Sequence, residues 1–206
     1  RAGVDRGRNA ARVLLALERF RYLTTEQAGE LYFQTIKDEG QRLRKASERL
    51  RKLYQRGLCY RMRVPNEYYI YSLKNTGYTH KVSHYLAIVD IWIRLLQLRP
   101  AGSALYSEVE KKQSHDIVTD LYIQYSNEWQ KVKKDYFIEV ELNSSGDIKE
   151  KIRKYEALAW SRSNENACPC VLAIVTNRRG IYSEIEGYEW EVPVKVYPLS
   201  LEGWVW

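Results

Sequence analysis

The segment from Gln41 to Arg56 constrains the fold more than any other part of the chain. Its apolar residues recur at the spacing of one helix face, and its basic residues recur at the same spacing on a neighbouring face. Gly57 follows at the position where glycine commonly ends a helix. We therefore predict an amphipathic helix with one buried side and one basic side. The basic side consists of Arg42, Lys45, Arg49, Lys52 and Arg56.

The residues around this segment predict a complete small module. Ala10 to Phe20 has helical spacing, and Thr24 to Gln27 has the sequence of a capping box at the start of a second helix. After the basic helix, Leu58 to Val64 alternates like a strand, with Arg61 and Arg63 on one face. Pro65 to Glu67 then predicts a turn into a second strand, Tyr68 to Leu73. Three helices followed by a basic hairpin is the order of a winged helix-turn-helix.

The net charge of +7 is unevenly distributed. Residues 1–80 carry 17 Lys and Arg against 8 Asp and Glu, whereas residues 81–206 carry 16 against 18. Such asymmetry favours a polyanionic partner for the first half, either nucleic acid or an anionic membrane surface. A solvated helix face is the usual explanation of a charged run, but it normally mixes signs.

Between Gln41 and Arg63, Glu48 is the only acidic residue. We therefore predict that the basic helix enters the major groove of double-stranded DNA and that the hairpin lies along the backbone or the minor groove. The predicted DNA-binding residues are Arg42, Lys45, Arg49, Lys52, Arg56, Arg61 and Arg63.

The second half predicts a mixed sheet flanked by helices. Its first strands are separated by short polar turns and should run antiparallel, whereas the last follows a helix and should be parallel to its neighbour. We thus expect an α+β protein with a winged-helix domain at 1–77 and an α/β domain at 78–206. The expected elements are a helix at 80–98, strands at 104–111, 117–125 and 136–142, a helix at 148–160, a strand at 171–175, and one or two strands within 188–196.

Carboxylates recur along the strands of the second half. Glu139 and Glu141 alternate and so share one face of a strand. Like charges this close repel each other in a half-buried site unless a cation lies between them, and Mg²⁺ or Mn²⁺ suits oxygen ligands. Such an ion could activate water against a phosphodiester. The alternative is a polar strand face in water. The other carboxylates are Glu108, Glu110, Asp116 and Asp120.

Three cysteines, an odd number, favour a reduced compartment over a disulfide framework. The sequence has no apolar run of membrane-spanning length and its start lacks the apolar core of a signal peptide. We therefore expect a cytoplasmic protein without a membrane partner. Cys168-Pro169-Cys170 could ligate a metal, but lacks the further ligands of a zinc site, which favours small residues in an apolar strand.

The chain resembles the replication-relaxation family of plasmid and mobile-element proteins. The resemblance rests on residues 14–28, 50–58 and 84–90, and more loosely on Thr119-Asp120-Leu121, on 137–141 and on 151–155. It implies a winged helix joined to a domain similar to the PD-(D/E)XK nucleases, with a role in plasmid replication, relaxation or maintenance. It also implies plasmid replication proteins as partners, and we expect a homo-oligomer such as a dimer.

By this resemblance Asp120 and Glu139 would hold the metal, with Glu108 as a further ligand and with Glu141 and Lys154 as further catalytic residues. The chain departs from the nuclease pattern, because Glu141 stands where a lysine is expected and Thr119 precedes the aspartate. Lys151 or Lys154 could reach back from the following helix. Three readings remain open: a DNA-binding factor with an inactive nuclease-like domain, which the missing lysine favours; an active metal-dependent nickase; and a transcriptional regulator that dimerises through its second half.

Overall fold

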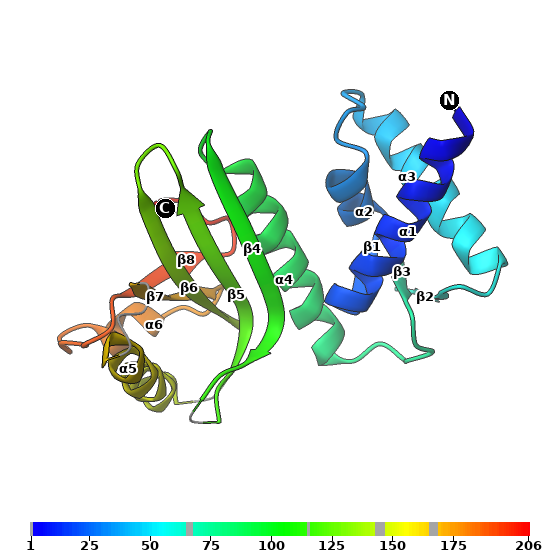
Figure 1. Cartoon of the computed structure of the whole chain (residues 1–206). Helices are drawn as coiled ribbons and strands as arrows, with labels where there is room; N and C mark the ends of the chain where they lie inside the picture. The colour runs from blue at the N-terminus through cyan, green and yellow to red at the C-terminus, as the bar shows by residue number, and fades with distance from the viewer. Residues whose placement is uncertain (1, 65–67, 115, 143–146, 165–168) are drawn as a thin grey trace. The chain divides into compact units, whose positions relative to one another are not determined.

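The computed structural model describes residues 2–64, 68–114, 116–142, 147–164 and 169–206. The chain forms two compact units, Arg1–Ile93 and Arg94–Trp206 (Figure 1). The sequence placed the boundary earlier, at residue 77. The difference arises because helix α4 (His80–Gln97) contributes Val82 and Leu86 to a core cluster around Ile70 in the first unit.

The first unit combines helices with a small antiparallel sheet. The sheet has the order β1-β3-β2, so the first strand pairs with the last. Residues 65–67, where the sequence predicts the hairpin turn, lie outside the described residues. The elements are α1 (Ala2–Phe20), β1 (Tyr22–Thr24), α2 (Thr25–Tyr32), α3 (Glu39–Gln55), β2 (Tyr60–Arg63) and β3 (Tyr69–Ser72).

Local sequence determines where α2 begins and α3 ends. The Thr24 side chain accepts a hydrogen bond from the Gln27 backbone and the Gln27 side chain accepts one from the Thr24 backbone, which confirms the predicted capping box. At the end of α3, Gly57 N–H donates to the Tyr54 carbonyl and Leu58 N–H to that of Leu53. Gly57 has a φ of +69°. This double bond is a Schellman motif, which favours glycine at this position.

Replacing Gly57 with alanine should destabilise the first unit by about 1–2 kcal/mol, because an L-residue is unfavourable at positive φ. A Cβ at this position meets nothing within 4 Å, so the cost is conformational and not steric. Urea unfolding of the full chain measures it. Gly77→Ala is the matched control, since Gly77 also has open space and no positive φ; equal losses in the two variants would contradict the assignment.

The second unit is built on a five-stranded mixed sheet of order β4-β5-β6-β7-β8. Strands β4, β5 and β6 are antiparallel, whereas β7 and β8 run parallel to β6, so the predicted strand directions are confirmed. The elements are β4 (Ser103–Lys112), β5 (Val118–Asn127), β6 (Val132–Glu141), α5 (Ile148–Asn164), β7 (Cys170–Thr176), α6 (Ile181–Ile185) and β8 (Val194–Pro198).

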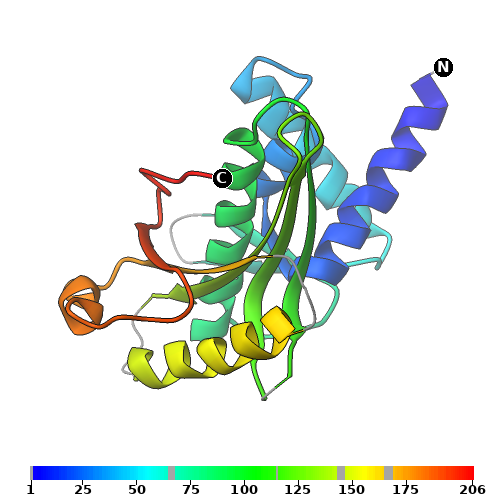
Figure 2. The same ribbon diagram turned by 60° about the vertical axis from the view of Figure 1, so that its left-hand side comes forward.

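Helix α5 packs on one face of this sheet (Figure 2). Ile152, Tyr155 and Leu158 recur at helical spacing and form a buried cluster with Phe137 of β6 and Leu172 of β7. Because α5 connects the parallel strands β6 and β7, it crosses the sheet beside the carboxyl end of β6. This packing fixes the start of α5 close to the carboxylates of β6.

The fold is mixed α+β, as predicted, with local differences. Helix α6 and strand β1 were not predicted, because five and three residues are too few for a periodic pattern. Of the two strands considered in the tail, β8 forms, whereas 188–192 is irregular. Among the described residues, no helix is long and apolar enough to span a bilayer.

Candidate functional site

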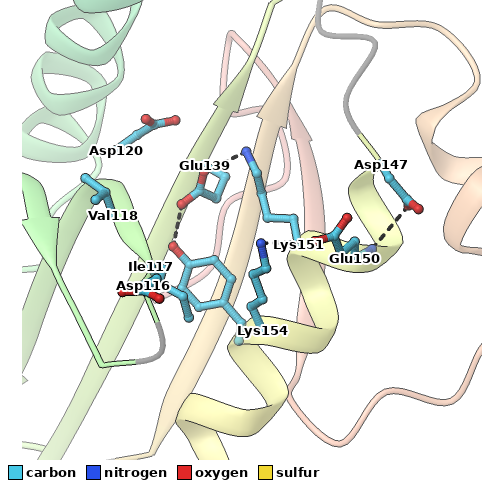
Figure 3. Close-up of a pocket in the computed structure, with 10 residues that line it drawn as sticks. Asp116, Ile117, Val118, Asp120, Glu139, Asp147, Glu150, Lys151 and Lys154 are labelled. Carbon is cyan, nitrogen blue, oxygen red and sulfur yellow. Dashed lines mark hydrogen bonds and ion pairs between the residues drawn. The ribbon is translucent and has the colours of Figure 1, made fainter.

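A pocket of about 310 Å³ opens in the second unit between the start of β5, the carboxyl half of β6 and the first turns of α5 (Figure 3). Its lining is mainly charged, and carboxylates outnumber lysines. The carboxylates are Asp116, Asp120, Glu139, Asp147 and Glu150, and the lysines are Lys151 and Lys154.

Asp120 lies where the pairing of β5 with β6 ends. Paired residues extend from Asn127–Val132 to Leu121–Ile138. Beyond them, the Val140 N–H donates to Asp120 Oδ2 at 2.8 Å. The Asp120 carboxylate thus takes over a strand amide and is fixed at the edge of the pocket.

Glu139 and Glu141 share one face of β6, as their spacing predicts, and both are almost completely buried, at 3% and 6% exposure. Lys151 of α5 connects them: its Nζ donates to Glu139 Oε2 at 2.9 Å and also to Glu141 Oε1 (Figure 3). Two buried carboxylates on one face require such a counter-charge. The lysine absent from β6 is therefore compensated by one from α5.

A hydroxyl chain holds the other oxygen of Glu139. Tyr155 OH donates to Glu139 Oε1, and Thr119 Oγ1 lies 2.8 Å from the same Tyr155 oxygen. Thr119 and Tyr155 are both buried. With Lys151 on Oε2, the Glu139 carboxylate has a fixed orientation.

The charges in this site are unbalanced. Burial, and next the charge of Asp120, raise the pKa of Glu139 from 4.5 to about 7, although Lys151 and Tyr155 oppose the change. Burial lowers the pKa of Lys151, but Glu139 and Glu141 more than offset this and raise it. One ammonium therefore compensates for three carboxylates, counting Asp120, and the site retains negative charge.

Two residues from the sequence-predicted site have other partners. Lys154 lines the pocket, but its Nζ pairs with Glu150 at 3.1 Å and the side chain is 53% exposed. Glu108 does not line the pocket; it pairs with Lys111 at 3.1 Å and accepts a hydrogen bond from Tyr106. Asp120, Glu139 and Lys151 are the groups that the structure brings together.

The helical spacing of α5 could have distinguished the two lysines. Lys151 precedes the inward-facing Tyr155 by four residues and so lies on the same face one turn earlier, whereas Lys154 is adjacent to Tyr155 and lies on another face. The roles of Tyr155 and Thr119 as partners of Glu139 had no signal in the sequence.

Cys170 begins β7, and burial raises the pKa of its thiol. Cys168 lies outside the described residues. The metal reading of this pair therefore stays untested.

The basic side of α3 is separated from its buried side, as predicted. Ala46, Leu50 and Leu53 are buried, and Lys45, Lys52 and Arg56 are exposed. Lys45 lies 3.6 Å from Glu48, a surface pair that contributes little to stability. Arg44 and Arg51 are exposed on the same helix and extend the basic surface beyond the residues that the sequence pattern selected.

Other predicted DNA-binding residues are less accessible. Arg42 pairs with Glu30 of α2 at 2.7 Å, and Arg49 is half-buried. The Arg61 guanidinium lies between two rings, 4.6 Å from the centroid of Tyr54 and 4.2 Å from that of Tyr69. Arg63 is exposed on the same strand.

The pocket offers an oriented carboxylate, a second carboxylate nearby and a buried ammonium, which together can hold a cation and stabilise negative charge on a bound group. The first unit offers a ridge of exposed cations. Comparison of the chain with models of known families, with curated proteins and with solved structures finds no match.

Proposed function

We propose that the first unit binds double-stranded DNA and that the second unit uses a divalent cation to cut one strand of it. The observation that carries the second part is the contact of Lys151 Nζ with Glu139 Oε2 at 2.9 Å in a pocket that Asp120 also lines. This contact supplies the lysine whose absence from β6 favoured an inactive domain. The resemblance to the replication-relaxation family supports a role in plasmid replication, relaxation or maintenance.

We interpret the first unit as a winged helix. The order of its helices and its β1-β3-β2 sheet, which ends in the hairpin β2–β3, support this interpretation. In such a module α3 enters the major groove, and exposed cations contact phosphates and displace counterions. Lys45, Lys52 and Arg56 on α3 and Arg63 on β2 are suited to this role because they are exposed.

We interpret the second unit as similar to the PD-(D/E)XK nucleases. Three antiparallel strands, a helix and a parallel strand follow each other in the chain, with Asp120 on the second strand and Glu139 on the third. The pocket fits Mg²⁺ or Mn²⁺ in its chemistry, because its donors are oxygens and its excess negative charge raises the pKa of Glu139. When bound, such a cation polarises a phosphate and lowers the pKa of water.

The residues of the chain have distinct tasks in this proposal. Asp120 and Glu139 hold the cation, and Tyr155 with Thr119 keeps the Glu139 carboxylate in one orientation. The Lys151 ammonium neutralises charge that develops on the phosphate. Because each chain has one such pocket, a single event cuts one strand and relaxes a supercoiled plasmid.

A second candidate is a DNA-binding factor whose second unit is inactive. It is favoured by the engagement of both Glu139 oxygens with Tyr155 and Lys151, so that an internal ammonium serves as the cation. Among the described residues no three His, Cys, Asp or Glu side chains gather as metal ligands. Mg²⁺ commonly binds through one or two carboxylates, so this arrangement does not disfavour it.

The test is incubation of the purified chain with supercoiled plasmid and Mn²⁺, Mg²⁺ or EDTA, followed by separation of supercoiled, nicked and linear forms. We expect nicked product with either metal, none with EDTA, and faster nicking at pH 8 than at pH 6, because Glu139 must lose its proton to bind a cation. Retardation of the plasmid without cutting would establish the second candidate instead.

A further inference from the structure

The turn between β5 and β6 carries the most exposed large apolar side chain in the described part of the chain. Trp129 is 76% exposed. The turn itself is ordered by backbone and side-chain contacts, since Gln130 N–H donates to Asn127 Oδ1 at 3.1 Å and Asn127 pairs with Ser103 of β4. An ordered turn thus presents an indole to solvent.

Gly102 forms a seat for this indole. A Cβ at Gly102 would lie 2.6 Å from Cδ2 of Trp129 and 2.8 Å from Cε2 and Cε3, so the ring packs against the glycine backbone. Gly102 also has a φ of +74°. A side chain at this position would displace the ring. The chain therefore keeps one face of Trp129 supported while most of the side chain stays in water.

Lysines follow the indole on the same hairpin. Lys131 and Lys133 are exposed and Lys134 is half-buried, and none of them forms an ion pair with a described carboxylate. Glu128 is the only acidic residue from 128 to 134. This excess of positive charge contrasts with residues 81–206 as a whole, in which acidic residues outnumber basic ones.

We propose that this hairpin tip, defined as Trp129, Lys131, Lys133 and Lys134, binds an unpaired nucleic-acid strand. An exposed ring face stacks on any base, and neighbouring lysines attract the phosphates, which is the combination that single-strand binding uses. Paired bases inside a duplex do not offer such a face. The local positive charge favours a polyanionic strand over a protein partner, and a pre-positioned indole loses little conformational freedom on binding.

The position of the tip is compatible with the pocket that contains Asp120. The strand β5 connects them, and its seven residue steps from Asp120 to Asn127 span about 23 Å. A strand freed at the pocket could therefore be held at the tip. The binding itself does not depend on cutting, so this proposal goes beyond the function proposed above.

The test is fluorescence anisotropy of labelled dT16 and rU16 with the full chain in EDTA, where no cutting interferes. Trp129→Ala should weaken binding by roughly 5- to 100-fold, the range of one stacked base, and Trp129→Phe should weaken it less. Gly102→Ala should weaken it although the tryptophan remains, because the ring loses its seat. Lys131→Ala with Lys133→Ala should lower the salt dependence by about 0.7 per phosphate contact.

Absence of dT16 and rU16 binding, or equal affinity of the unchanged protein and Trp129→Ala, would overturn the proposal. Self-association that disappears in Trp129→Ala, with no strand bound, would assign the tip to a contact between copies and would also overturn it. Binding of a labelled duplex and plasmid nicking, measured on the same variants, test the proposed function separately, since Trp129→Ala should leave both nearly unchanged.

Discussion

Replacing Lys151 with methionine should reduce plasmid nicking by roughly 10²- to 10³-fold, the usual effect of removing one group that stabilises developing charge. Lys151 is the one cation that contacts Glu139 and Glu141 among the described residues. Lys154→Met is the matched control: the residue lies in the same pocket lining and on the same helix, but pairs with Glu150. Its nicking rate should stay within about threefold of the unchanged protein.

Loss of Lys151 also leaves buried carboxylates without their counter-charge, so stability must be measured together with activity. Thermal unfolding of both variants provides this control, with nicking assayed well below the lower midpoint. Lys151→Arg keeps the charge and should preserve the fold while it shifts the position of the cation. Equal nicking by the Lys151→Met and Lys154→Met variants would remove Lys151 from the site and favour the inactive scaffold.

The sequence predicted those parts of the fold whose signals are local and periodic. The buried stripe of α3, the capping box at Thr24 and the glycine at the end of α3 each act within one or two turns, and the structure has all three. The strand directions in the second unit followed from connection lengths. Local patterns that decide an element's start or direction therefore transferred directly to the structure.

The domain boundary could not be read from the sequence. A polar link at residues 74–77 looked like a division, yet Val82 and Leu86 pack around Ile70 beyond it. Packing of a helix onto a distant strand leaves no local trace. The boundary consequently shifted into α4.

The candidate site was predicted in part, for a similar reason. Alternation placed Glu139 and Glu141 on one face of β6, but the partners of these carboxylates come from other elements. Lys151 and Tyr155 reach them only because α5 crosses the sheet beside the end of β6. The choice between Lys151 and Lys154 thus depended on the orientation of α5.

Replacing Lys45, Lys52 and Arg56 together with alanine should weaken duplex binding on the order of 10²- to 10³-fold at 0.1 M salt. Each phosphate contact contributes about 0.9 to the slope of log K against log salt, so three lost contacts lower the slope by about 2.7. These residues were chosen because they are exposed. Arg42 and Arg61 have partners in the protein and are left intact, since their removal would disturb packing as well as charge.

The matched control replaces three exposed basic residues of the second unit, Lys112, Arg153 and Lys195, with alanine. It changes the net charge by the same amount, so a general loss of attraction to DNA would affect both triple variants equally. We expect the control to keep its salt slope within about half a contact of the unchanged protein. If the α3 variant keeps its slope as well, the ridge on α3 is a solvated helix face and the DNA contacts lie elsewhere. If the α3 variant loses its slope and nicking of plasmid falls with it, recruitment by the first unit precedes cutting by the second, because the α3 substitutions leave every residue of the pocket unchanged.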